Sequence, residues 1–142
     1  MQYLARIQSD GDGFLVTFPS LPEAITGGDT EREAVANAID AMEVVLLTYV
    51  LDGRPMPPDD IRPSRGGSYY LLRPSAMASA KMAFILAFRE SGMTRVALAA
   101  KLGKAEGEVR RMLDPYHATK IASLEAALLA LGKRLIVSVE AA

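Results

Sequence analysis

The chain has 142 residues, of which half are apolar and 23% are charged, and it contains no cysteine and one histidine. This balance is typical of a folded globular protein. Neither disulfides nor thiolate metal sites can form, and His117 alone cannot make a histidine cluster, so we expect no metal and no cofactor. The N-terminus has no signal-peptide core, and apolar stretches such as 44–51 are much shorter than the roughly 20 residues of a membrane span. We therefore expect a cytoplasmic protein without a membrane association.

The net charge of −1 hides an asymmetry between the two halves of the chain. Residues 1–73 hold six basic and eleven acidic side chains, whereas residues 74–142 hold ten basic and six acidic ones. Because summed charge steers molecular encounters, an acidic half joined to a basic half suggests two different partners. The alternative is two solvated surfaces without such partners.

The first half begins with two expected strands, at 3–8 and 14–18, which are separated by an Asp-Gly-rich turn. Asp-Gly pairs tolerate the positive φ of a tight hairpin, so the two strands are expected to pair antiparallel. A short third strand is expected at 24–28, after the prolines that end the second.

A long helix is expected next, because Thr30 and Glu33 form a capping-box pattern. Apolar residues at three- and four-residue spacing predict its buried face: Val35, Ile39, Met42, Leu46, Tyr49 and Val50. Gly53 is placed to end this helix. The Pro- and Gly-rich segment 54–65 is expected to be a loop that either wraps a partner or tethers a final strand at 68–73. The result is a β-β-β-α-β unit whose helix covers one sheet face.

From residue 74 the apolar period changes from two to 3.6, which indicates a second, all-α domain. The expected domains are therefore 1–74 and 75–142, and the fold class is α+β. Four helices are expected, at 76–90, from a Thr94 cap to residue 102, at 105–113 and at 121–131. Glycines or a proline separate them: Gly92, Gly103, Pro115 and Gly132.

The second and third of these helices have the spacing of a helix-turn-helix, in which the later helix enters the major groove of DNA. Ala99 allows close approach of the two helices, Gly103 permits the turn, and Val109 holds the recognition helix to its neighbour. The expected DNA-facing residues are Arg95, Lys101, Lys104, Glu106, Glu108, Arg110, Arg111 and Lys120. The alternative is a plain helical bundle with solvated charges.

The segment 134–139 is β-branched and alternating, but it follows the last helix of an otherwise helical domain. A lone strand there would leave its backbone groups unpaired, so we expect it to pair with its copy in a second chain. The expected dimerisation residues are Leu135, Ile136, Val137 and Val139. An extended tail packed over its own bundle is the alternative, and a tetramer is the alternative to a dimer.

The second half resembles the Cro/CI-type, or XRE-like, helix-turn-helix family over 94–103, 108–113 and 121–132. That resemblance implies binding to operator DNA. Glu106 and Glu108 depart from the family, which usually places neutral polar residues at these DNA-facing positions. Carboxylates repel phosphate, although one can accept a hydrogen bond from cytosine N4.

The first half resembles the HicB antitoxin domain. The residues that carry the resemblance are 10–14, 16–22, 26–30, Glu33, Ala34, Ala38 and 52–57. The two resemblances cover nearly the whole chain, in the order found in HicB proteins with a helix-turn-helix tail. They imply a truncated RNase H-like fold that blocks HicA, a small mRNA-cleaving toxin with a double-stranded-RNA-binding fold, and a tail that binds the operator of its own operon.

The acidic surface is the expected contact for a basic, RNA-cleaving partner, and solvated surface is the equal alternative for each acid. The candidates are Asp10, Asp12, Asp29, Glu31 and Glu43. We expect no catalysis, because turn, cap and surface roles already explain the acids that a two-metal nuclease would require.

The sequence thus predicts an antitoxin that inhibits its toxin and represses its own operon. A stand-alone transcription regulator, whose first domain senses something else, is the alternative.

Overall fold

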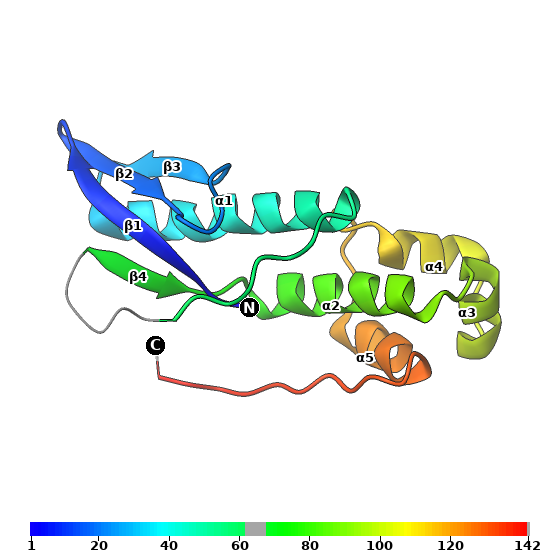
Figure 1. The fold of residues 1–142 in the computed structure, drawn as a ribbon. Helices are drawn as coiled ribbons and strands as arrows, with labels where there is room; N and C mark the ends of the chain where they lie inside the picture. The colour runs from blue at the N-terminus through cyan, green and yellow to red at the C-terminus, as the bar shows by residue number, and fades with distance from the viewer. Residues whose placement is uncertain (62–67, 142) are drawn as a thin grey trace. The chain divides into compact units, whose positions relative to one another are not determined.

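The structure is a computed structural model that describes residues 1–61 and 68–141. The chain divides into two compact units, Met1–Ser75 and Ala76–Ala142. Within the described residues, the first unit contains a four-stranded antiparallel sheet and one helix, and the second contains four helices (Figure 1). The fold is therefore α+β, and the first unit has the expected order β-β-β-α-β.

The sheet is built around the hairpin of β1 (Tyr3–Asp10) and β2 (Gly13–Thr17). Gly11 has a φ of +60° in the connecting turn, as the Asp-Gly sequence predicts. β3 (Ile25–Gly28) pairs with β2, and β4 (Tyr69–Leu72) pairs with β1, which gives the order β3-β2-β1-β4. All pairings are antiparallel.

The helix α1 (Glu31–Leu51) begins as the capping pattern predicts. Thr30 Oγ1 accepts a hydrogen bond from the Glu33 amide at 3.1 Å, and the Glu33 carboxylate accepts one from the Asp29 amide at 3.3 Å. Both interactions satisfy backbone donors that the start of a helix leaves open.

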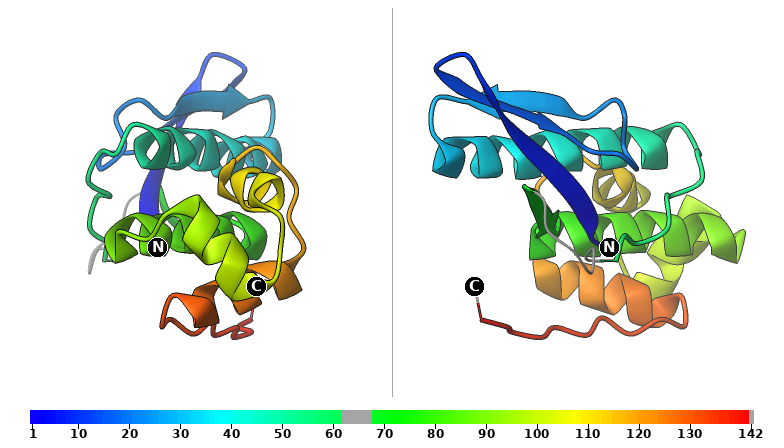
Figure 2. Two further views of the ribbon diagram at one scale, coloured as in Figure 1. Left: turned by 90° about the vertical axis from the view of Figure 1, so that its right-hand side faces the viewer. Right: turned by 60° about the vertical axis from the view of Figure 1, so that its left-hand side comes forward.

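The buried face of α1 differs in part from the expected one. Met42, Leu46, Tyr49 and Val50 are buried as predicted, but Ala34 and Ala38 are fully buried in place of Val35 and Ile39, which are half-buried. The reason is close packing of α1 on the sheet, which Figure 2 shows from two sides. A Cβ added at Gly28 of β3 would lie 2.6 Å from the Ala34 amide nitrogen, so only small residues fit at this contact.

The 21 residues of α1 also reach the length and mean hydropathy of a membrane span, with a value of 1.6 over its most apolar window. A core helix passes the same test by composition, and the buried face of α1 packs on the sheet.

The segment after α1 runs along β1 and is held there by hydrogen bonds. The Asp60 amide donates to the Gln2 carbonyl at 2.9 Å, the Leu4 amide donates to Asp60 Oδ2 at 2.9 Å, and the Tyr3 hydroxyl donates to the Pro57 carbonyl at 2.9 Å. The part of this segment up to residue 61 is therefore anchored to the start of β1. Residues 62–65 of the loop expected at 54–65 lie outside the described residues.

The second unit consists of α2 (Ala76–Ser91), α3 (Arg95–Leu102), α4 (Glu106–Leu113) and α5 (Ile121–Ala130). Three glycines with positive φ end helices as expected: Gly92, Gly103 and Gly132. One fully buried side chain from each helix contributes to a shared core: Phe84, Leu98, Val109 and Leu124. The helices are thus held by a common apolar centre.

The expected strand at 135–139 is absent from the single chain, which continues after α5 as an extended trace (Figure 1). A strand requires hydrogen bonds to a neighbouring strand, and the described sheet does not include this segment. Leu135 lines a groove together with Leu86 and Leu128. In contrast, Ile136 and Val139 are 81% and 96% exposed. The segment therefore packs over its own bundle only at its beginning.

A cluster of three polar side chains, Glu23, Tyr49 and Arg54, connects the C-terminal end of α1 to the turn before β3. Tyr49 Oη donates a hydrogen bond to Glu23 Oε2 at 2.7 Å, and Arg54 Nη2 lies 2.8 Å from Glu23 Oε1. The Arg54 guanidinium also lies 3.6 Å from the centroid of the Tyr49 ring, which is a cation–π contact. The hydrogen bond from Tyr49, followed by that from Arg54, lowers the pKa of Glu23 from 4.5 to about 2.

This cluster predicts how acid destabilises the first unit. Because the pKa of Glu23 is lower in the folded chain, the stability it contributes is complete above pH 4.5 and is lost as the pH falls toward 2. We expect Glu23→Gln to remove this part of the acid dependence, as measured by urea unfolding between pH 2.5 and 6. Tyr49→Phe, which keeps the arginine contact, should remove less of it. Identical pH profiles for Glu23→Gln and the unchanged chain would contradict the assignment.

Candidate functional site

The first candidate site is the surface formed by α3, α4 and their connection. Gly103 adopts φ +64° and ψ 32°, and the Lys104 amide donates to the Ala99 carbonyl at 2.9 Å, so the chain turns sharply after α3. Ala99 is buried, and Val109 is fully buried. The small residue, the turn glycine and the apolar anchor thus occupy the structural positions that the sequence predicts for them.

The cationic side chains expected to face DNA come from α3, α4, the connection between them and the residue that precedes α5. Arg95 opens α3, Arg110 and Arg111 lie on α4, and all three are exposed. Lys120 is the N-terminal cap residue of α5 and is exposed as well. Lys101 differs, because its Nζ donates a hydrogen bond to the Ala130 carbonyl at 2.7 Å and so serves the end of α5.

Three of these cations gather at a hollow of about 170 Å³. Lys104, Arg111 and Lys120 line it, and Glu108 lies there with them, with its Oε2 3.6 Å from Lys104 Nζ. His117 also lines the hollow and is exposed in the loop after α4, as expected. The positive charge of this surface is therefore partly neutralised by a carboxylate of the same helix.

The loop between α4 and α5 is held by a buried lysine that the sequence pattern does not single out. Lys81 of α2 is only 4% exposed, and its Nζ donates a hydrogen bond to Thr119 Oγ1. Burial lowers the pKa of Lys81, whereas the nearby Asp114 carboxylate raises it. The sequence indicates this role only through the position of Lys81, which directly precedes the apolar residue Met82 in the helix expected at 76–90.

Glu106 lies between two of the exposed arginines. Its Oε1 is 3.3 Å from Arg95 Nε, and its Oε2 is 3.1 Å from Arg110 Nη2. Because Glu106 is the first residue of α4, its carboxylate lies where the positive end of the helix dipole favours it. The acid that departs from the helix-turn-helix pattern therefore has cationic partners within its own domain.

The second candidate site is one end of the sheet in the first unit. Asp10 ends β1 and Asp12 lies in the turn that follows it, and both are exposed, whereas Asp29 and Glu31 lie at the start of α1. Pairing of Phe14 with Gly28 places the start of β2 beside the end of β3, so these four acids gather at the same end. The fifth predicted acid is separate, because Glu43 lies about three turns along α1 and accepts a hydrogen bond from the Ser75 amide.

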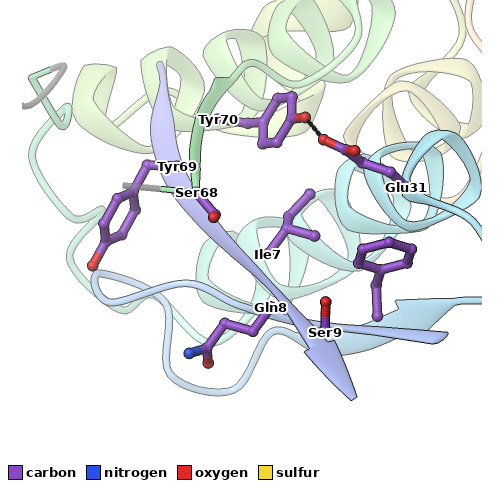
Figure 3. A pocket seen from close by; sticks show the side chains of 8 residues that line it. Ile7, Gln8, Ser9, Glu31, Ser68, Tyr69 and Tyr70 are labelled. Carbon is purple, nitrogen blue, oxygen red and sulfur yellow. Dashed lines mark hydrogen bonds between the residues drawn. The ribbon is translucent and has the colours of Figure 1, made fainter. Parts of the chain in front are cut away.

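A pocket of about 590 Å³ opens at this end of the first unit (Figure 3). Ile7, Phe14, Tyr69 and Tyr70 contribute much of its lining, and the Tyr70 hydroxyl donates a hydrogen bond to Glu31 Oε1. From the sequence alone, these aromatic residues are predicted only to lie in strands. Their place in the pocket depends on the pairing of β4 with β1, which no local pattern specifies.

No metal site is evident in the part of the chain that the structure describes. Within residues 1–61 and 68–141, no group of three or more histidine or acidic side chains is placed to hold a metal ion.

Comparison with known proteins gives matches over most of the chain. The chain is 36% identical over 141 residues to Antitoxin HicB of Pseudomonas fluorescens (strain Pf0-1), which covers 99% of this chain and 95% of that protein. It is 36% identical over 135 residues to Antitoxin HicB 2 of Photorhabdus laumondii, which covers 95% and 94% of the two chains. It is 35% identical over 123 residues to Antitoxin HicB of Escherichia coli (strain K12), which covers 87% of each chain. No family model matches the chain.

These matches run through both units and define a two-unit protein of the antitoxin class. The chain belongs to the HicB family.

Proposed function

We propose that this chain is an antitoxin whose first unit binds and inhibits a HicA-like, mRNA-cleaving toxin and whose second unit represses its own operon. The observation that carries the proposal is the similarity to proteins named Antitoxin HicB over both units. An acidic first half and a basic second half support the division between a basic protein partner and DNA. In this proposal the chain neutralises its toxin by binding it and catalyses no reaction itself.

DNA binding is assigned to α3 and α4 acting as a helix-turn-helix. The short connection, the buried Val109 and the exposed Arg110 and Arg111 support α4 as the helix that enters the major groove. Arg95, Lys104 and Lys120 would then contact phosphates around it.

Replacing both arginines of α4 tests this assignment. We expect Arg110→Ala with Arg111→Ala to weaken binding to the DNA that precedes the chain's own gene by about a hundredfold, because direct contacts and released counterions are both lost. A gel-shift titration at fixed salt measures this effect. Neutralisation of the toxin should be unchanged.

The matched control is Arg6→Ala with Arg32→Ala, two exposed residues of the first unit that carry the same charge. It should bind the DNA as the unchanged chain does. Equal affinity for both double variants would refute the role of α4.

Toxin binding is assigned to the acidic end of the first unit. Four exposed acids lie at this end of the unit, and one of them, Glu31, lines a pocket together with three aromatic residues. Aromatic residues are enriched at the centre of protein interfaces, and surrounding charges steer a partner of opposite sign. A small basic protein fits this surface.

The acids of the β1–β2 turn provide the test. Asp10→Asn with Asp12→Asn should lower the association rate with the toxin several-fold and reduce its salt dependence, because charges at the rim act mainly on encounter. Stopped-flow or biosensor kinetics at two salt concentrations would measure it. Asp40→Asn with Asp52→Asn removes equal charge elsewhere on the first unit and should change the rate less. The assignment fails if the two double variants have the same association rate.

Assembly through the C-terminal segment is also part of the proposal. Ile136, Val137 and Val139 are 81%, 69% and 96% exposed, and the segment that contains them runs as an extended trace (Figure 1), so its backbone is accessible to a second strand. Pairing across a two-fold axis would join two DNA-binding units, so that the dimer contacts two half-sites.

Truncation distinguishes this pairing from a simple tail. A chain that ends at residue 132 should lose dimer mass in light scattering and should bind operator DNA more weakly, because a monomer contacts one half-site. A chain that ends at residue 139 keeps the pairing segment and should remain dimeric. An unchanged mass for the shorter chain would show that the dimer is held elsewhere.

A further inference from the structure

The first turn of α4 contains a three-residue ionic cluster that joins the two helices of the proposed helix-turn-helix. Glu106 uses one carboxylate oxygen for Arg95 of α3 and the other for Arg110 of α4, at 3.3 and 3.1 Å. Arg95 and Arg110 remain more than half exposed, at 51% and 65% of their side-chain surface, whereas Glu106 is 34% exposed. The Glu106 side chain is therefore less exposed to solvent than the two arginine side chains that it contacts.

We propose that Glu106 is a positioning residue that increases the sequence specificity of DNA binding by holding Arg95 and Arg110 in a fixed arrangement. This inference rests on the proposed DNA binding of α3 and α4. It assigns the acid at the start of α4 a role that depends on its two arginine partners, and not on a direct contact with a base.

Specificity would increase because hydrogen bonds to base edges depend on the direction of the arginine side chain, whereas charge attraction to phosphates does not. An arginine side chain loses conformational freedom when it binds, and a partner that already holds it reduces that loss, so that hydrogen bonds to a base edge form with less entropic cost. The carboxylate also cancels one positive charge near the phosphates, and this charge would otherwise favour binding to every sequence alike. Both effects increase the difference between the affinity for a specific DNA sequence and the affinity for other sequences.

Three variants of the full-length chain separate these effects. Glu106→Gln keeps the shape but loses the charge, and it replaces one of the two oxygens that each contact an arginine with an NH2 group, which cannot accept a hydrogen bond. Glu106→Asp keeps the charge on a side chain that is one methylene shorter. Glu125→Gln, on the exposed face of α5, removes the same charge away from α3 and α4.

Each variant is used to select binding sites from a random-sequence DNA library, and its affinity for one random 30-base-pair duplex is measured over a range of salt concentrations. We expect Glu106→Gln to bind the random duplex several-fold more tightly, with a salt slope steeper by about one, and to enrich a less defined motif. Glu106→Asp should keep the salt slope of the unchanged chain but enrich a motif of reduced definition. Glu125→Gln should enrich the same motif as the unchanged chain.

The inference is overturned if Glu106→Gln enriches the same motif as the unchanged chain, or if Glu125→Gln broadens the motif equally. It is also overturned if Glu106→Asp matches the unchanged chain in both measurements, since charge alone would then explain the effect. If the unchanged chain enriches no sequence at all, the proposed DNA binding fails together with this inference. That outcome is distinct from one in which the unchanged chain selects a motif and Glu106→Gln selects the same one.

Discussion

The close contact between α1 and β3 is the constraint on which the first unit depends. At Gly28 the backbone of the strand lies so near the Ala34 amide that an added Cβ would be 2.6 Å from it. This contact fixes where α1 begins, and the Thr30 cap then sets the direction of its first turn. As a result, Glu31 approaches Tyr70 of β4, and the acids at the start of α1 lie at the same sheet end as those of the β1–β2 turn. The proposed toxin surface is thus a consequence of backbone packing.

The surface of the second unit depends on apolar packing between helices, since this unit has no strand in the part that the structure describes. A shared apolar core holds four helices, and a glycine with positive φ allows α4 to follow α3 after a short turn. Polar contacts then adjust the surface: Lys81 holds the loop after α4, and Glu106 connects the first residues of α3 and α4. Apolar packing therefore places the helices, and a few charged side chains arrange the face that we assign to DNA.

Local signals in the sequence predicted the elements of this fold well. The caps at Thr30 and Thr94 and the turn at Gly103 have direct physical causes in neighbouring residues, and the structure contains each of them. Features that depend on tertiary contacts were not accessible in the same way. Spacing alone cannot show that Ala34 and Ala38 are buried more deeply than Val35 and Ile39, because the depth depends on how closely the helix meets the sheet.

In the candidate sites, too, local features could be predicted from the sequence, whereas features that depend on tertiary contacts could not. The acids and cations were identified by type and position, but their partners were not, because these pairs form between separate elements. Glu106 was recognised as a departure from the helix-turn-helix pattern, whereas its contact with Arg95 depends on the packing of α3 and α4. The aromatic pocket beside Glu31 likewise required the pairing of β4 with β1, which joins residues far apart in the chain.

Inhibition of a toxin by direct binding is the function that we propose for this chain. The most direct measurement is RNA cleavage by the small protein encoded beside this chain's gene, with and without an equimolar amount of the purified chain. We expect the neighbouring protein to cleave RNA when it is alone, and we expect cleavage to stop when the chain is added. Cleavage that continues unchanged at equimolar or higher concentrations of the chain would contradict it.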